Sequence, residues 1–305
     1  DGQAYLMTSI GTDGTVTLLT MNEDVTKITA SKVVHYNKGA EGSKIIKCAG
    51  WYYLFNALPS ILALSVSRAR SLQGPWETRP QIDDTSGGHQ GALVDLANGE
   101  WAGFVMVDAG SIGRMTNISP VYWQDDWPIW GTPDAPGRVP DRAPKPIMGH
   151  PFAEPPASDD FSASTLGLQW QWNHNPDDRR WSLRERPGFL RLHATQADRL
   201  WTARNTLTQK GQGPGSRAIV KVDVRGLRPG DMCGVGTFGK ISAQLSIVGS
   251  DKGRRALTMM VTDSTEDGPR TETRVASVPV SGQTLWLRTD MDFVRDEGRV
   301  AYSRD

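Results

Sequence analysis

A short motif that recurs along the first 110 residues restricts the folds that this chain can adopt. A turn glycine precedes an aromatic, strand-like run at Gly2, Gly50 and Gly99, so successive glycines are 48 and 49 residues apart. A period near 50 residues, with about four strands per unit, is typical of a β-propeller blade. About three such units fit before residue 145, whereas closed propellers have about four to eight blades. The repeat therefore predicts an incomplete propeller over residues 1–145.

The remaining sequence also predicts β-structure. Helical periodicity is nearly absent, and short apolar runs alternate with Gly, Pro, Asp and Asn, which indicates an all-β fold. Eight prolines lie between Pro133 and Pro156, and because proline cannot donate to a β-ladder, residues 146–158 are predicted to be a linker. Alternation resumes beyond it, as in Val220, Val222 and Val224, so residues 159–305 are predicted to form a two-sheet sandwich.

The charge balance argues against some classes of partner. Lys plus Arg and Asp plus Glu number 34 each, which gives a formal net charge of zero. A neutral chain with scattered charges is not typical of proteins that bind nucleic acid or membrane surfaces electrostatically. The longest apolar runs are also too short to span a bilayer. We therefore expect neither a nucleic-acid nor a membrane partner, and the sequence leaves the oligomeric state open.

Several short motifs, in a fixed order, resemble one family of carbohydrate-active enzymes. They are E-G-S-K at residues 41–44, G-H-Q-G at 88–91, G-R at 113–114, L-G-L-Q-W-Q-W at 166–172 and R-W-S-L-R-E-R-P-G-F-L-R-L at 180–192. Together they are similar to glycoside hydrolase family 43, which contains β-xylosidases and α-L-arabinofuranosidases. The resemblance implies a five-bladed propeller followed by a concanavalin-like β-sandwich. It also implies an exo-acting, inverting hydrolase of xylan- or arabinoxylan-type substrates, releasing xylose or arabinofuranose.

The resemblance assigns roles to five residues, and three of them have an ordinary structural alternative. Glu41 would be the general acid; otherwise it is a solvated turn residue. His89 would help to hold a hydrated calcium ion or support the acid, although calcium prefers oxygen ligands; otherwise it is a hydrogen-bonded structural histidine. Arg114 would bind sugar hydroxyls with its planar fork of donors, unless it is only a salt-bridged arginine. Gln90 would bind substrate or orient its neighbour, and Phe238 would be an aromatic contact that the sandwich contributes.

Two features keep another function open. The family's general base and pKa-tuning residue are both Asp, and neither has a matching position in residues 1–305. The chain also begins inside a strand-like run at Asp1 and ends in mid-pattern for a hairpin at residues 301–305, which predicts truncation at both ends. A non-catalytic carbohydrate-binding fragment is therefore the alternative to an enzyme; a purely structural module is disfavoured because Glu41 and Arg114 occur together. We expect Glu41, Arg114 and His89 to face one pocket. The sequence does not fix the compartment, and the resemblance favours secretion or the periplasm.

Overall fold

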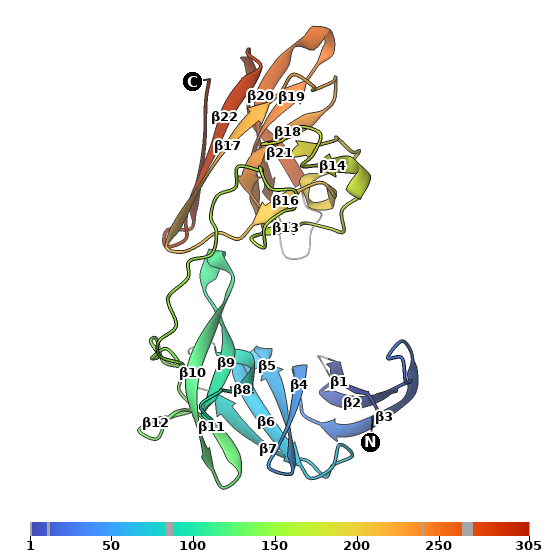
Figure 1. Ribbon diagram of the computed structural model, residues 1–305, viewed down its shortest axis with the longest axis vertical. Coiled ribbons are helices and arrows are strands. Elements are labelled where there is room, and N and C mark those ends of the chain that lie inside the picture. The colour runs from blue at the N-terminus through green and yellow to red at the C-terminus, as the bar shows by residue number, and fades with distance from the viewer. Residues whose placement is uncertain (1, 11–12, 83–87, 240, 264–270, 305) are drawn as a thin grey trace. The chain divides into compact units, whose positions relative to one another are not determined.

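The fold is described here from a computed structural model (Figure 1). It describes the chain except for residues 1, 11–12, 83–87, 240, 264–270 and 305. The chain divides into two compact units, residues 1–151 and residues 152–305. Strands make up 53% of the chain and helices 5%, which confirms the all-β prediction.

The first unit consists of three antiparallel sheets that follow one another along the chain (Figure 1). The first sheet, in the order β1-β2-β3, contains β1 (Tyr5–Ile10), β2 (Thr15–Met21) and β3 (Ile28–Tyr36). The second, in the order β4-β5-β6-β7, contains β4 (Glu41–Cys48), β5 (Trp51–Leu58), β6 (Ala63–Ala69) and β7 (Glu77–Ile82). The third, in the order β12-β11-β10-β9-β8, contains β8 (His89–Asp95), β9 (Trp101–Asp108), β10 (Arg114–Gln124), β11 (Trp127–Thr132) and β12 (Ala135–Pro136).

The glycine repeat has a clear structural counterpart. Gly2, Gly50 and Gly99 all have positive φ, at 76°, 76° and 84°, a conformation that glycine adopts without steric cost. They precede β1, β5 and β9, which therefore correspond to one another. Within their sheets β5 pairs with both β4 and β6, and β9 pairs with both β8 and β10, whereas β1 pairs with β2.

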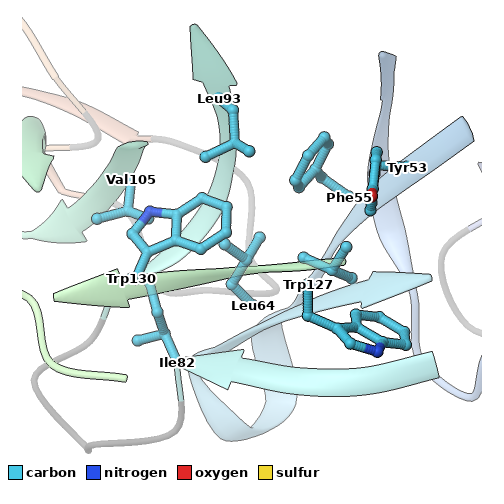
Figure 2. Close-up of a cluster of buried hydrophobic side chains, with 9 residues drawn as sticks. Tyr53, Phe55, Leu64, Ile82, Leu93, Val105, Trp127 and Trp130 are labelled. Atoms are coloured by element: carbon cyan, nitrogen blue, oxygen red, sulfur yellow. The ribbon is translucent and has the colours of Figure 1, made fainter. Parts of the chain in front are cut away.

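The main core of the first unit lies between its second and third sheets. Figure 2 shows its buried side chains converging from β5, β6, β7, β8, β9 and β11. They are Tyr53, Phe55, Leu64, Val66, Ile82, Leu93, Val105, Trp127 and Trp130. Full burial of each large apolar side chain stabilises the fold by about 1.5–3 kcal/mol. The packing of this cluster is therefore the main interaction that holds the two sheets together. A smaller core joins the first and second sheets, with Met7, Val16, Leu18 and Leu54.

One edge of this core is a stack of guanidinium groups and indole rings. The Arg68 guanidinium lies 4.5 Å from the centroid of Trp51 and 4.2 Å from that of Trp127. Arg70 covers Trp51 at 3.7 Å, and Arg79 covers Trp127 at 4.5 Å. Arg68 thus lies between two rings that come from different sheets.

The same corner is closed by hydrogen bonds to the turn between β10 and β11. Arg68 donates to the carbonyl of Asp125 at 2.7 Å, and Tyr53 donates to the carbonyl of Asp126 at 2.9 Å. Burial, together with the nearby Asp126 carboxylate, raises the pKa of Tyr53 to about 12. The second and third sheets are therefore joined by polar contacts as well as by the apolar core.

The second unit contains two short β-ribbons and two larger sheets. The ribbons pair β13 (Trp170–Trp172) with β16 (Leu207–Gln209) and β14 (Trp181–Ser182) with β15 (Arg191–Leu192). The sheet β17-β22-β23 contains β17 (Gly215–Asp223), β22 (Thr284–Asp292) and β23 (Glu297–Ser303). The sheet β18-β19-β20-β21 contains β18 (Met232–Thr237), β19 (Ser242–Gly249), β20 (Arg255–Asp263) and β21 (Thr271–Val280).

The two larger sheets of the second unit bury a common core, as expected for a sandwich. Its buried residues are Val224, Leu245, Ile247, Leu257, Val280, Leu285 and Leu287. At the end of β17, Arg225 and Arg186 both donate hydrogen bonds to the Asp223 carboxylate. These bonds, chiefly the one from Arg225, hold the pKa of Asp223 well below its usual range.

Helical structure in the described residues is limited to single 3-10 turns. They are η1 (Pro59–Ile61), η2 (Gly110–Ile112), η3 (Asp178–Arg180), η4 (Leu200–Thr202) and η5 (Asp251–Gly253). None of these described helices has the length or the apolar character to cross a membrane. The boundary between the two units, at residues 151 and 152, lies in the proline-rich segment; the limits predicted for the linker, 146–158, stay a prediction.

Candidate active site

Glu41 is the first residue of β4 and stands next to an irregularity in the strand. The register of β4 with β5 shifts between Glu41 and Lys44, so a β-bulge lies directly after Glu41. Gly42, inside the bulge, has φ of +60°. Bulges bend a strand and re-aim its side chains. The Glu41 carboxylate is half-buried, and it makes no hydrogen bond or ion pair in the part of the chain that the structure describes.

A second bulge, at the start of β8, meets the first. The register of β8 with β9 shifts between His89 and Gly91, and the residue between them, Gln90, has φ of +51°. The Gln90 side chain packs on Gly42: a Cβ added at Gly42 would lie 2.8 Å from Gln90 Nε2 and 3.1 Å from its Cγ. A side chain at residue 42 would have to displace the end of Gln90, and the φ of +60° favours glycine there as well. The structure therefore brings Gln90 against the residue that follows Glu41.

His89, the first residue of β8, is 2% exposed and pairs with Met106 of β9. Calcium ions in proteins are held mainly by carboxylate, carbonyl and water oxygens. In the described ranges, no group of three or more His, Cys, Asp and Glu side chains is placed to hold a metal ion. The side chains described around His89 thus do not form a carboxylate site for calcium. The assignment of His89 to a hydrated calcium ion stays a prediction.

Arg114 opens β10 and is exposed. Its Nε donates to Asp108 Oδ1 at 3.3 Å, and the two residues face each other in the pairing of β10 with β9. On β9, Asp108 lies two residues beyond Met106, the partner of His89, so Arg114 and His89 are at the same end of the third sheet. The structure thus pairs Arg114 with a neighbouring carboxylate. A pocket shared with Glu41 stays a prediction.

Phe238 belongs to the second unit, where it follows β18. Its ring stacks on Trp201, with the centroids 5.3 Å apart and the planes inclined by 25°. Both side chains are partly exposed, at 37% each. One face of the Phe238 ring is therefore covered by another aromatic ring, and its contact with a sugar at Glu41 stays a prediction.

The surroundings of Glu41 include polar residues that the sequence motifs did not identify. Asn56 of β5 donates from Nδ2 to Ser43 Oγ at 2.9 Å and to the carbonyl of Glu41 at 3.4 Å. Ser43 Oγ in turn donates to Ser9 Oγ at 3.0 Å. One signal was available in the sequence: Asn56 is the single amide in the apolar run from Trp51 to Leu58. Its partners depend on strand pairing and could not be read from that run.

A lysine completes the bulge. Lys44 Nζ donates to the carbonyl of Gly42 at 3.1 Å, and burial lowers the pKa of its ammonium group. The backbone carbonyls of Glu41 and Gly42 are therefore both hydrogen-bonded to side chains. Lys44 is directed to the backbone, so it does not pair with the Glu41 carboxylate, which has no partner among the residues that the structure describes.

The fold and these neighbours together define a class of protein. The chain has successive blade-like sheets, one of which carries the Glu41 carboxylate at the start of a strand, and a sandwich unit follows them in the sequence. These features place the chain among β-propeller proteins with an appended β-sandwich. Residues 1–128 match the family model for glycosyl hydrolases family 43, and residues 158–305 match that for the beta xylosidase C-terminal concanavalin A-like domain. The chain belongs to glycoside hydrolase family 43.

Individual relatives support the same assignment. A protein of Xylanibacter ruminicola is 37% identical over 236 residues, which are 74% of this chain and 45% of the relative. A beta-xylosidase of Formosa agariphila is 31% identical over 291 residues, covering 79% of this chain and 49% of the relative. The solved structure of a bifunctional GH43-CE protein of Bacteroides eggerthii has a TM-score of 0.82 and 32% identity, covering all of this chain and 41% of that one. The chain thus spans about half the length of the curated relatives that it matches.

Proposed function

We propose that the protein is an exo-acting, inverting glycosidase that releases xylose from xylan-type chains, with Glu41 as its general acid. The observation that carries the proposal is the half-buried Glu41 carboxylate, which has no partner in the described residues and stands at a bulge within the segment that matches the family. Support for the substrate class comes from the relatives and from the concanavalin-like domain named after beta xylosidases. In this proposal the substrate is a carbohydrate.

The reaction needs a proton donor and an activated water molecule. Glycosidic bonds break through an oxocarbenium-like transition state, and the leaving oxygen must accept a proton as the bond lengthens. Glu41 would supply that proton. In inverting enzymes a second carboxyl group, about 6.5–9.5 Å away, activates water on the other face of the sugar. The resemblance assigns that role to an Asp without a matching position in residues 1–305, so no residue here is given it.

The other site residues would bind or orient the sugar. Arg114 would donate to sugar hydroxyls, and for this it must exchange its contact with Asp108 for the substrate. That exchange costs little free energy. The side chains of Arg114 and Asp108 are 63% and 50% exposed, and exposed ion pairs are worth about 0–1 kcal/mol. Gln90, which packs on Gly42, would line the site beside the acid. Phe238 would offer the free face of its ring.

The test is a comparison of Glu41→Gln with wild type, in protein expressed from the complete gene. General acid catalysis is worth about 10²–10⁴-fold, and we expect a loss of that size in kcat for xylobiose. Glu23→Gln, at an exposed turn, is the control and should keep wild-type activity. Xylose release is measured by chromatography, and NMR of the first product anomer tests inversion.

Several results would contradict the proposal. Unchanged turnover in Glu41→Gln would mean that Glu41 is not the acid. A wild-type protein that binds xylo-oligosaccharides without cleaving them would favour the non-catalytic alternative. Faster release from 4-nitrophenyl α-L-arabinofuranoside than from the β-xyloside would replace xylose by arabinofuranose as the glycone. The 305-residue chain, assayed in parallel, is expected to be much less active than the complete gene product, because no base is assigned within it.

A further inference from the structure

The bulge after Glu41 leaves a gap in the ladder between β4 and β5. Glu41 pairs with Ala57, and the next paired residue, Lys44, faces Phe55. Gly42 and Ser43 therefore both stand opposite the single residue Asn56. An extra residue of this kind interrupts the regular backbone hydrogen bonds of the two strands. Something other than the ladder must then fix the backbone on either side of Gly42.

The Asn56 side chain fixes the backbone on either side of Gly42. Its Nδ2 donates both to the Glu41 carbonyl, at 3.4 Å, and to Ser43 Oγ, at 2.9 Å. Ser43 continues the chain of bonds to Ser9 on β1. Asn56 is 0% exposed, so packing on all sides keeps the amide in place. One buried side chain thus holds the residues before and after Gly42.

Core stability by itself does not explain an asparagine at this position. Asn56 Oδ1 is buried and has no hydrogen-bond partner among the described residues. A buried acceptor without a partner costs free energy, and such groups call for an explanation. Departures from the rules of core packing are expected where function requires them. The amide is next to the candidate acid, which suggests the reason for its presence.

We propose that Asn56 is a positioning residue for proton donation by Glu41. By holding the Glu41 carbonyl and Ser43, it fixes the direction in which the Glu41 carboxylate leaves the strand, while Gln90 packs on Gly42. Asn56 itself does not contact the sugar in this scheme. The inference rests on the proposed function, since it needs Glu41 to be the acid. It adds Asn56 as the residue that orients the Glu41 carboxylate.

The first experiment compares two leaving groups. A sugar alkoxide must be protonated as it departs, whereas 4-nitrophenolate leaves with little assistance, so a misplaced acid harms the first reaction more than the second. A misplacement of about 1 Å can cost on the order of 100-fold in rate. For Asn56→Ala we expect kcat on xylobiose to fall by about 10–100-fold, with a much smaller loss on 4-nitrophenyl β-xyloside. If the enzyme releases arabinofuranose and not xylose, the same comparison is made with two arabinofuranosides, one with a sugar and one with 4-nitrophenolate as the leaving group. Equal losses on both substrates would refute the positioning role.

The second experiment is a double-mutant cycle. Residues that act as a unit have non-additive effects. In a Glu41→Gln background Asn56→Ala should cause no further loss on xylobiose, because the group that Asn56 positions can no longer donate a proton. The same fractional loss in both backgrounds would overturn the inference. If Glu41→Gln has no effect, the proposed function fails instead; if only Asn56→Ala has none, the positioning role fails alone.

Control variants separate positioning from folding. Ser67→Ala removes another fully buried polar group, one that contacts Thr78 and His35 and not the bulge. It should affect thermal stability without any dependence on the leaving group. Should Asn56→Ala fail to fold, Ser43→Ala removes the acceptor of the Asn56 bond and should show the same leaving-group dependence. Ser43→Thr, which keeps the hydroxyl, should restore activity. A Ser43→Ala protein without that dependence would also contradict the proposal.

Discussion

The Arg68 stack offers a direct test of what joins the second and third sheets of the first unit. The side chain of Arg68 is 12% exposed, and its guanidinium lies between the rings of Trp51 and Trp127. A cation–π contact is worth about 0.5–1 kcal/mol when exposed and about 2 kcal/mol when desolvated. Since Trp127 is fully buried, the two contacts of Arg68 together should contribute about 2–3 kcal/mol. The substitution that tests this is Arg68→Met, which keeps length and apolar packing.

Two hydrogen-bonded contacts change the expected total. The bond to the Asp125 carbonyl comes from a charged donor and contributes about 1.5–3 kcal/mol. The contact with Glu77 adds little, because Glu77 is 60% exposed and surface ion pairs are worth about 0–1 kcal/mol. Methionine recovers part of the packing through its sulfur–aromatic contacts. We therefore expect Arg68→Met to lower the free energy of unfolding of the first unit by about 3 kcal/mol.

Arg70→Met provides the matched control. Arg70 covers one face of Trp51 and is exposed, so its replacement should cost about 0.5–1 kcal/mol. Urea unfolding is followed by tryptophan fluorescence, to which the two indole rings of the stack contribute together with the other tryptophans of the chain. In the unfolding transition that includes the first unit, the urea concentration at the midpoint should fall several times more for Arg68→Met than for Arg70→Met. Similar, small shifts for both variants would show that the stack does not hold the sheets together.

Two pH effects follow from the structure. The pKa of Tyr53 is raised to about 12, so the native phenol stays neutral at a pH near 10, where the phenol of the unfolded chain ionises. The stability that Tyr53 contributes is therefore complete below pH 10 and is lost as the pH rises from 10 to 12. In an ultraviolet titration, the Tyr53→Phe variant should lack the tyrosine that ionises last in wild type. An earlier titration of that group in wild type would refute its burial. The pKa of Asp223 is lowered by Arg225 and Arg186, so its contribution is complete above the unfolded value near 4 and is lost as the pH falls through the native one. Asp223→Asn should accordingly lower the melting temperature at pH 7 and lose most of that difference near pH 2; a constant difference would count against the ion pair.

Much of the architecture was predictable because it depends on local patterns. A turn glycine with positive φ recurs at Gly50 and Gly99, and apolar runs alternate with turn residues, so blades and their period could be read from the chain. Glu41 could be selected as the candidate acid from the motif that surrounds it. In the described structure its carboxylate has no partner, and its role as the acid stays a prediction. Its catalytic role remains to be tested by Glu41→Gln.

The surroundings of the acid were decided by tertiary structure alone. The contact of Gln90 with Gly42 joins residues that are 48 positions apart, and it exists because bulges on strands of two different sheets, β4 and β8, meet. Asn56 looked like an anomaly in an apolar run; its partners follow from a register shift that the run does not encode. Likewise, nothing local to Arg68 indicates that Trp127 will cover it. The sequence by itself determined which strands and turns form, because backbone preference and hydrophobic alternation act over a few residues. Tertiary structure decided which side chains meet, because strand register and sheet packing are set by the whole set of non-local contacts at once.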